Sequence, residues 1–150
     1  MEWISELLVE RFVSNNGSAF VCPQYELRQE FKGKLSADFV VLEFGNKDLI
    51  WVEVSDGGSP GSVEAKASSC GAIYLDALMQ QLQHDTKGVV NPDEWTAKFL
   101  GFVREVHLDG ARRKYGKDGR IYFRAVEDTC SSDRWNIRKE GLLPDTATVT

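Results

Sequence analysis

Hydrophobic residues recur along the chain with two different periods, and each period predicts a different kind of element. From Trp3 to Phe12 apolar residues lie three and four positions apart, which is the spacing of a helix that buries one face. This stretch ends at Asn15-Asn16-Gly17, residues suited to a left-handed helix end. The sequence therefore predicts a first helix over roughly residues 3 to 16.

Aromatic and β-branched residues then predict three strands in succession. The first covers Ala19 to Arg28, where Pro23 favours an edge or bulge position because proline cannot donate a ladder hydrogen bond. The second and third run from Leu35 to Phe44 and from Leu49 to Ser55. The short turn between them predicts an antiparallel hairpin.

A second helix is predicted after the glycine-rich connection 55–62, because Ser59-Pro60 suits the first turn of a helix. It should run to about Gln83. Its apolar stripe is wide enough to pack on a sheet and contains Val63, Ala67, Cys70, Ile73, Tyr74, Ala77 and Leu78.

The C-terminal half returns to strand-like patterns. Ala97 to His107 and Ile121 to Val126 are interpreted as further strands, and Asp109-Gly110 and Asp118-Gly119 as turns. Residues 112–116 fit either a strand or a loop. Strands that alternate with helices indicate an α/β (α+β) protein.

Length and composition favour one domain. A chain of 150 residues with 42% hydrophobic residues can build a single core, which we place in residues 1–140, with 141–150 as a C-terminal tail. No apolar run approaches the roughly 20 residues that span a bilayer. The N-terminus carries acidic Glu6 and Glu10 and does not resemble a secretory leader, and the three cysteines are far apart. We therefore expect a cytoplasmic protein that does not enter membranes.

The net charge of −5 argues against a protein devoted to tight, nonspecific nucleic-acid binding. Basic residues nevertheless gather between Arg112 and Arg124, where six cations stand against one anion. If DNA or RNA binds, we expect it to contact this stretch, and the predicted contacts are Arg112, Arg113, Lys114, Lys117 and Arg120.

Two carboxylates on the predicted hairpin are the main candidates for chemistry. If Gly45-Asn46 forms the centre of a type II′ turn, residues whose numbers add up to 91 are paired, and Asp38 then faces Glu53. Sliding the turn by one residue pairs Asp38 with Ser55 but keeps Glu53 on the same face. Only a bulge or a loop of odd length would separate the two side chains.

Burying two carboxylates beside apolar neighbours costs several kcal/mol unless a cation or a proton compensates. A divalent metal with oxygen ligands would compensate, and these ligands suit Mg²⁺ or Mn²⁺. In the alternative interpretation, one carboxylate points to solvent or pairs with an arginine such as Arg28 or Arg124.

At these residues the chain resembles the PD-(D/E)XK, or restriction-endonuclease-like, nuclease superfamily. Asp38 matches the first acidic residue of that family, and Glu53-Val54-Ser55 matches its (D/E)XK strand. The resemblance implies a central mixed β-sheet flanked by two helices. It also implies Mg²⁺ held by Asp38, Glu53, the main-chain carbonyl of Val54 and an acidic residue of the first helix, for which Glu6 fits best and Glu10 is the substitute.

The chain departs from this family at Ser55, which stands where the family has a lysine that helps to activate water. Some families supply this lysine from the next helix, and Lys66 is the candidate here; as an alternative, Lys66 is an ordinary solvated residue. Two functions are then open. The chain either hydrolyses phosphodiester bonds in DNA or RNA, with Asp38, Glu53 and Lys66 as catalytic residues, or is a catalytically degenerate relative that binds a protein partner as an immunity or accessory module. Substrate and oligomeric state stay open.

Overall fold

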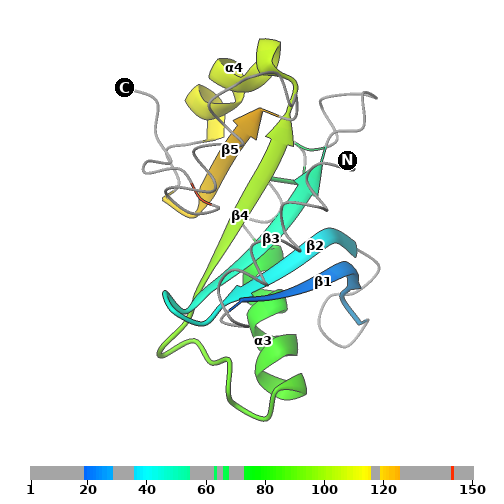
Figure 1. Cartoon of the computed structure of the whole chain (residues 1–150), viewed down its shortest axis with the longest axis vertical. Helices are drawn as coiled ribbons and strands as arrows, with labels where there is room; N and C mark the ends of the chain where they lie inside the picture. Colours follow the sequence, from blue (N-terminus) through cyan, green and yellow to red (C-terminus); the bar gives the residue numbers. More distant parts are fainter. Residues whose placement is uncertain are drawn as a thin grey trace.

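A mixed five-stranded sheet organises the part of the chain that the computed structural model describes, which is residues 19–28, 36–54, 63, 66–67, 73–115, 119–125 and 143. The strands lie side by side in chain order (Figure 1). They are β1 (Ala19–Glu26), β2 (Ser36–Glu43), β3 (Asp48–Val54), β4 (Thr96–Val103) and β5 (Ile121–Ala125). Strands β1 to β3 are antiparallel, whereas β3, β4 and β5 are parallel to one another.

Two helices make the crossovers that parallel neighbours need. Helix α3 (Leu75–Asp85) precedes β4, and α4 (Glu105–Tyr115) joins β4 to β5. The predicted mixed sheet with helices is thereby confirmed at the level of an α+β fold. The predicted first helix lies outside the described residues, and no described helix is long and apolar enough to cross a membrane.

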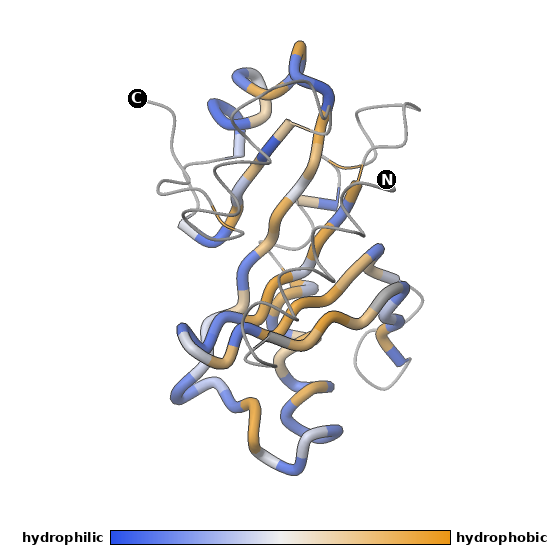
Figure 2. Tube along the Cα trace, in the orientation of Figure 1, coloured by the Kyte–Doolittle hydropathy of each residue, from blue (hydrophilic) through white to orange (hydrophobic). Residues whose placement is uncertain are grey.

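Both faces of the sheet are buried, and Figure 2 shows the hydrophobic strands at the centre of the molecule. On one face, Val40, Trp51 and Phe99 pack with α3 and with Ala111 of α4. The opposite face forms a second cluster, which contains Phe39, Val41, Ile50, Val52, Val54, Leu100 and Phe102. Burial on both faces explains why the strands appear in the sequence as nearly continuous apolar runs.

The β2–β3 hairpin has the predicted register but a different turn. Phe39 pairs with Val52 and Glu43 pairs with Asp48, so paired numbers add up to 91 as expected. The predicted type II′ turn is wrong, because Lys47 (φ 55°), and not Gly45, takes the left-handed conformation. The register is unchanged because the four residues 44–47 form a loop of even length.

Helical residues occur where the second helix was predicted, and most of the described part of its stripe is buried. Val63, Ala67, Ala77 and Leu78 are buried as expected, and Tyr74 packs against the same core cluster. Ile73 is the exception, because it is 49% exposed, and the neighbouring Leu75 is buried. Residues 73–74 are π-helical and precede α3.

The segment after β4 corrects the sequence prediction. The strand ends at Val103 rather than His107, and Asp109-Gly110 lies inside α4 rather than in a turn. Packing favours the helix here, because Ala111 is 1% exposed and Leu108 contacts the same core cluster. Both options left open for residues 112–116, strand and loop, are wrong as far as Tyr115, because these residues belong to α4, whereas the strand predicted from Ile121 is confirmed.

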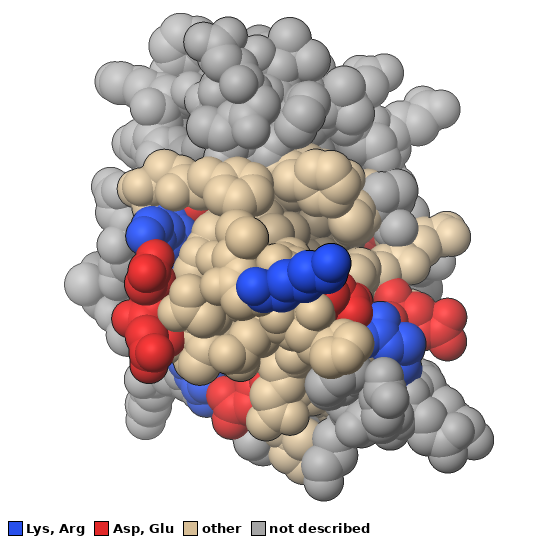
Figure 3. Space-filling model, turned by 90° about the horizontal axis from the view of Figure 1, so that it is seen from below, with Lys and Arg blue, Asp and Glu red and all other residues tan. Residues whose placement is uncertain are grey.

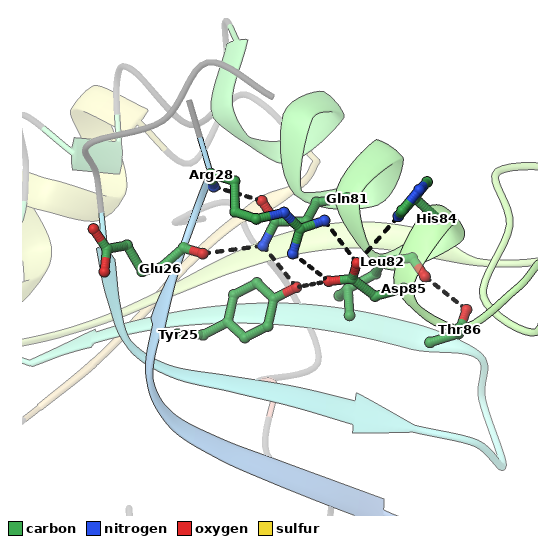
Figure 4. A network of polar contacts seen from close by, with 8 residues as sticks. All are labelled: Tyr25, Glu26, Arg28, Gln81, Leu82, His84, Asp85 and Thr86. Atoms are coloured by element: carbon green, nitrogen blue, oxygen red, sulfur yellow. Dashed lines mark hydrogen bonds and ion pairs between the residues drawn. The ribbon is translucent and has the colours of Figure 1, made fainter. Parts of the chain in front are cut away.

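A polar network joins the end of β1 to α3 (Figure 4). The Gln81 side chain is 1% exposed; its Oε1 accepts from the N–H of Arg28 (2.7 Å) and its Nε2 donates to the carbonyl of Glu26 (3.0 Å) and to the Tyr25 hydroxyl (2.9 Å). Arg28 also binds both oxygens of Asp85, at 2.8 and 2.6 Å, and this lowers the pKa of Asp85 to about 2. The buried Gln81 amide therefore binds main-chain groups at the end of β1 and just beyond it.

Gln81→Leu should destabilise the protein by about 2 kcal/mol, because it removes the three hydrogen bonds made by this buried side chain. Equilibrium urea unfolding measures this loss. Gln80→Leu, on the exposed side of the same helix, is the matched control and should change stability by less than about 0.5 kcal/mol. Equal effects of the two substitutions would contradict the role assigned to Gln81.

Candidate active site

The predicted carboxylates lie where the strands end rather than on an edge strand. At this end of the sheet β3, β4 and β5 finish and the antiparallel β2 begins. Asp38 is near the start of β2 and Glu53 near the end of β3. Both occupy positions that alternate with the second cluster, so both side chains lie on the face that carries α3. Ligands of open α/β sheets bind outside the carboxyl ends of parallel strands, which makes this end the natural place for a site.

The Glu53 side chain is the most deeply buried of the candidate groups, with 3% of the residue exposed. Its Oε1 accepts a hydrogen bond from the indole Nε1 of Trp51 at 2.9 Å. The ammonium of Lys66 lies 3.1 Å from both Oε1 and Oε2. A buried carboxylate is therefore held by one neutral donor and one cation.

Asp38 is half-buried and binds backbone rather than a cation. Its Oδ2 accepts a hydrogen bond from the N–H of Val54 at 2.8 Å. The β2–β3 ladder ends at the pair of Phe39 with Val52, so Asp38 links the two strands one step past the ladder. This bond holds the Asp38 carboxylate beside Val54, whose main-chain carbonyl is one of the metal ligands that the family resemblance implies.

Opposing effects act on the pKa of Glu53. Burial raises its pKa from an ordinary value near 4.5 to about 7; the Trp51 hydrogen bond lowers it, the charge of Asp38 raises it, and Lys66 lowers it. Desolvation thus outweighs the ion pair.

This pKa makes stability depend on pH in a defined direction. Because the folded pKa is higher than the unfolded one, the folded state binds more protons between about pH 4.5 and 7. Stability should therefore fall as pH rises through this window, by about 3 kcal/mol, and level off above it.

Glu53→Gln should abolish this fall, because the amide does not titrate but can still accept from Trp51. Urea unfolding at pH 5, 6, 7 and 8 measures it. Glu94→Gln, at an acidic residue exposed to solvent, should keep the wild-type profile. If stability depends on pH in the same way in wild type and in Glu53→Gln, Glu53 is not the group that causes the fall in stability.

The approach of Lys66 depends on a glycine that the sequence analysis did not single out. Gly101 pairs with Glu53 across β3 and β4. A Cβ at this position would lie 2.9 Å from Cγ1 of Val63 and 3.0 Å from the Phe123 ring. The missing side chain lets Val63 pack directly on the sheet, and Lys66 lies three positions after Val63 in the chain.

The structure brings Asp38, Glu53, Val54 and Lys66 together, and Lys66 is not the solvated residue of the alternative interpretation. Glu6 lies outside the described residues. Of the two arginines named in the alternative interpretation, Arg28 pairs with Asp85, and Arg124 is buried on β5. In the described ranges, no group of three His, Cys, Asp or Glu residues could hold a metal ion.

Four of the five predicted nucleic-acid contacts lie in the described part of the chain. Arg112, Arg113 and Lys114 form the last turn of α4, where positive charge favours the helix dipole. Arg112 donates to the carbonyl of Phe123 at 3.0 Å, and Arg120 lies 3.8 Å from Asp76. Lys117 is outside the described residues. Figure 3 shows the end of the molecule opposite to α4, where acidic and basic side chains are mixed among uncharged ones.

Trp51 is the functional candidate that sequence reasoning missed. The signal was present, because residues two apart on a strand share a face, and an indole must find an acceptor when it is buried. No family model, curated protein or solved structure matches the chain, so its function must be inferred from this site.

Proposed function

We propose that this protein is a metal-dependent phosphodiester hydrolase of the PD-(D/E)XK type that acts on DNA or RNA. The observation that carries the proposal is the Lys66 ammonium, which reaches both oxygens of Glu53 from the chain segment that follows β3. A lysine in this place can take over the work of the residue that Ser55 replaces. The order of the described strands and α3 agrees with the core expected for this superfamily.

The donor set fits a hard divalent cation. Asp38, Glu53 and Lys66 together carry a charge of −1 when all are ionised, so a divalent cation would be attracted to the site. Asp38, Glu53 and the main-chain carbonyl of Val54 would hold Mg²⁺ or Mn²⁺, with Glu6 as a further candidate ligand. When bound, the metal would stabilise charge on the phosphate and lower the pKa of water.

The residues of the chain have separate tasks in this proposal. The hydrogen bond from Val54 keeps Asp38 in place, and Trp51 does the same for Glu53. Lys66 is 31% exposed on its side chain, so its ammonium can turn from Glu53 toward the attacking water or the phosphate. Its positive charge would then favour the negative charge that develops during hydrolysis.

The second candidate function is a degenerate nuclease fold that binds a protein partner. One observation favours it: Trp51 and Lys66 already satisfy Glu53, and Val54 satisfies Asp38, so the polar groups are stable without a metal. Acidic surface would then recognise a basic partner. The two candidates differ in whether Lys66 leaves Glu53 when Mg²⁺ is added.

Lys66→Ala should reduce cleavage of a panel of single-stranded and double-stranded DNA and RNA by about 100-fold or more in Mg²⁺, because the water loses its lysine. Metal binding, measured by the rise in melting temperature with Mg²⁺ or Mn²⁺, should persist. Lys66→Met keeps the apolar stem and serves as a second variant. Asp38→Asn should lose both cleavage and metal stabilisation.

Lys98→Ala is the matched control, since Lys98 pairs with Asp48 and is similarly half-buried, but lies on β4 opposite Ile50, three positions before the residue that pairs with Glu53. It should cleave like wild type. Cleavage that survives Lys66→Ala would remove Lys66 from the mechanism. No cleavage by wild type with either metal, and weak activity created by Ser55→Lys, would favour the degenerate module.

A further inference from the structure

Trp51 lies two residues before Glu53 on the same face of β3 and is fully buried. Its ring contacts Tyr74 at the start of α3, with centroids 6.3 Å apart, and it belongs to the main core cluster. Packing thus fixes the indole plane, and the single N–H of the ring is aimed at Oε1 of Glu53 at 2.9 Å. A phenylalanine would fill most of the space but would leave this oxygen without its neutral donor.

The two oxygens of Glu53 are not equivalent. Oε1 accepts from both Trp51 and Lys66, which uses both of its lone pairs. Among the described residues, Oε2 accepts from Lys66 alone and keeps one position for another ligand. The side chain is therefore oriented with one satisfied oxygen and one available oxygen.

Trp51 and Lys66, the two donors to Glu53, also differ in how rigidly they are held. Lys66 is partly exposed on a flexible stem, and a cation that binds Glu53 would repel it. Trp51 is neutral, rigid and buried, so it remains on Oε1 when Lys66 leaves.

We propose that Trp51 is a positioning residue: its hydrogen bond to Oε1 of Glu53 persists when Lys66 leaves, so Oε2, which then has no donor among the described residues, is the oxygen presented to a divalent cation. This inference rests on the proposed metal-dependent function and adds the metal specificity of the site. Ligation through one oxygen suits Mg²⁺ and Mn²⁺, which need near-octahedral geometry, whereas Ca²⁺ readily takes a carboxylate through both oxygens. Trp51 therefore selects for the smaller ions.

The test compares Mn²⁺ and Ca²⁺ affinities by isothermal titration at pH 8, above the pKa of about 7 of Glu53. In Trp51→Phe, Mn²⁺ affinity should fall about tenfold, because a hydrogen bond to a charged group is lost, while Ca²⁺ affinity stays or rises. The Mn²⁺ to Ca²⁺ affinity ratio should thus fall about tenfold. Trp95→Phe is the matched control, because Trp95 is 5% exposed in the same core cluster and packs against Phe44. Its ratio should equal that of wild type.

If Trp51→Phe does not fold, the assigned indole N–H resonances of the wild type provide the same test. Saturating Mg²⁺ should shift the Trp51 resonance and leave that of Trp95 in place. An unchanged affinity ratio in folded Trp51→Phe, or an unmoved Trp51 resonance in protein that binds Mg²⁺, would overturn the positioning role and leave the hydrolase proposal standing. Wild type that binds none of these ions would overturn both.

Discussion

The burial of the Glu53 carboxylate between Trp51 and Lys66 is the constraint on which the candidate site depends. A carboxylate that is 3% exposed must be paired or protonated, and here desolvation is strong enough to raise its pKa to about 7 despite the ammonium at 3.1 Å. Two features support this arrangement of Glu53: Gly101 leaves room for Val63 and the segment that carries Lys66, and the core holds the Trp51 ring in place. Asp38, the second carboxylate of the site, is held by its hydrogen bond from the N–H of Val54. The same balance makes the site sensitive both to pH and to a competing cation.

The register of the β2–β3 hairpin could be predicted from the alternation of side chains along strands. Because side chains alternate along strands, any even loop between β2 and β3 puts Asp38 and Glu53 on one face, so the register was predictable although the turn type was not. The contact of Lys66 with Glu53 could be anticipated, because Ser55 stands where the family has its lysine and Lys66 was the candidate substitute; its catalytic role stays a prediction. The failures arose where tertiary packing outweighs local preference: Asp109-Gly110 has the sequence of a turn but lies in α4, whose buried Ala111 anchors it to the sheet. The exposure of Ile73 has no signature in the hydrophobic pattern and could not be foreseen.

The two proposed functions are alternative uses of the same three polar groups. As an ion pair, Glu53 and Lys66 neutralise each other and stabilise this end of the sheet without any ligand. In the proposed metal site, Glu53 would exchange its lysine for a divalent cation, and Lys66 would become available to water or phosphate. The physical difference lies in the relative affinity of the Glu53 oxygens for an ammonium and for a hydrated Mg²⁺, which the fold influences through Trp51, Asp38 and the depth of burial.

The most direct test of the metal site is a crystal structure determined at pH 8 in millimolar Mn²⁺, with anomalous diffraction used to locate the metal. We predict an anomalous peak about 2.1 Å from Oε2 of Glu53 and from a carboxylate oxygen of Asp38. We also predict that Trp51 still donates to Oε1 and that the Lys66 ammonium has moved away from its position 3.1 Å from Glu53. An intact pair of Lys66 and Glu53 with no anomalous peak beside these carboxylates would contradict the proposed metal site.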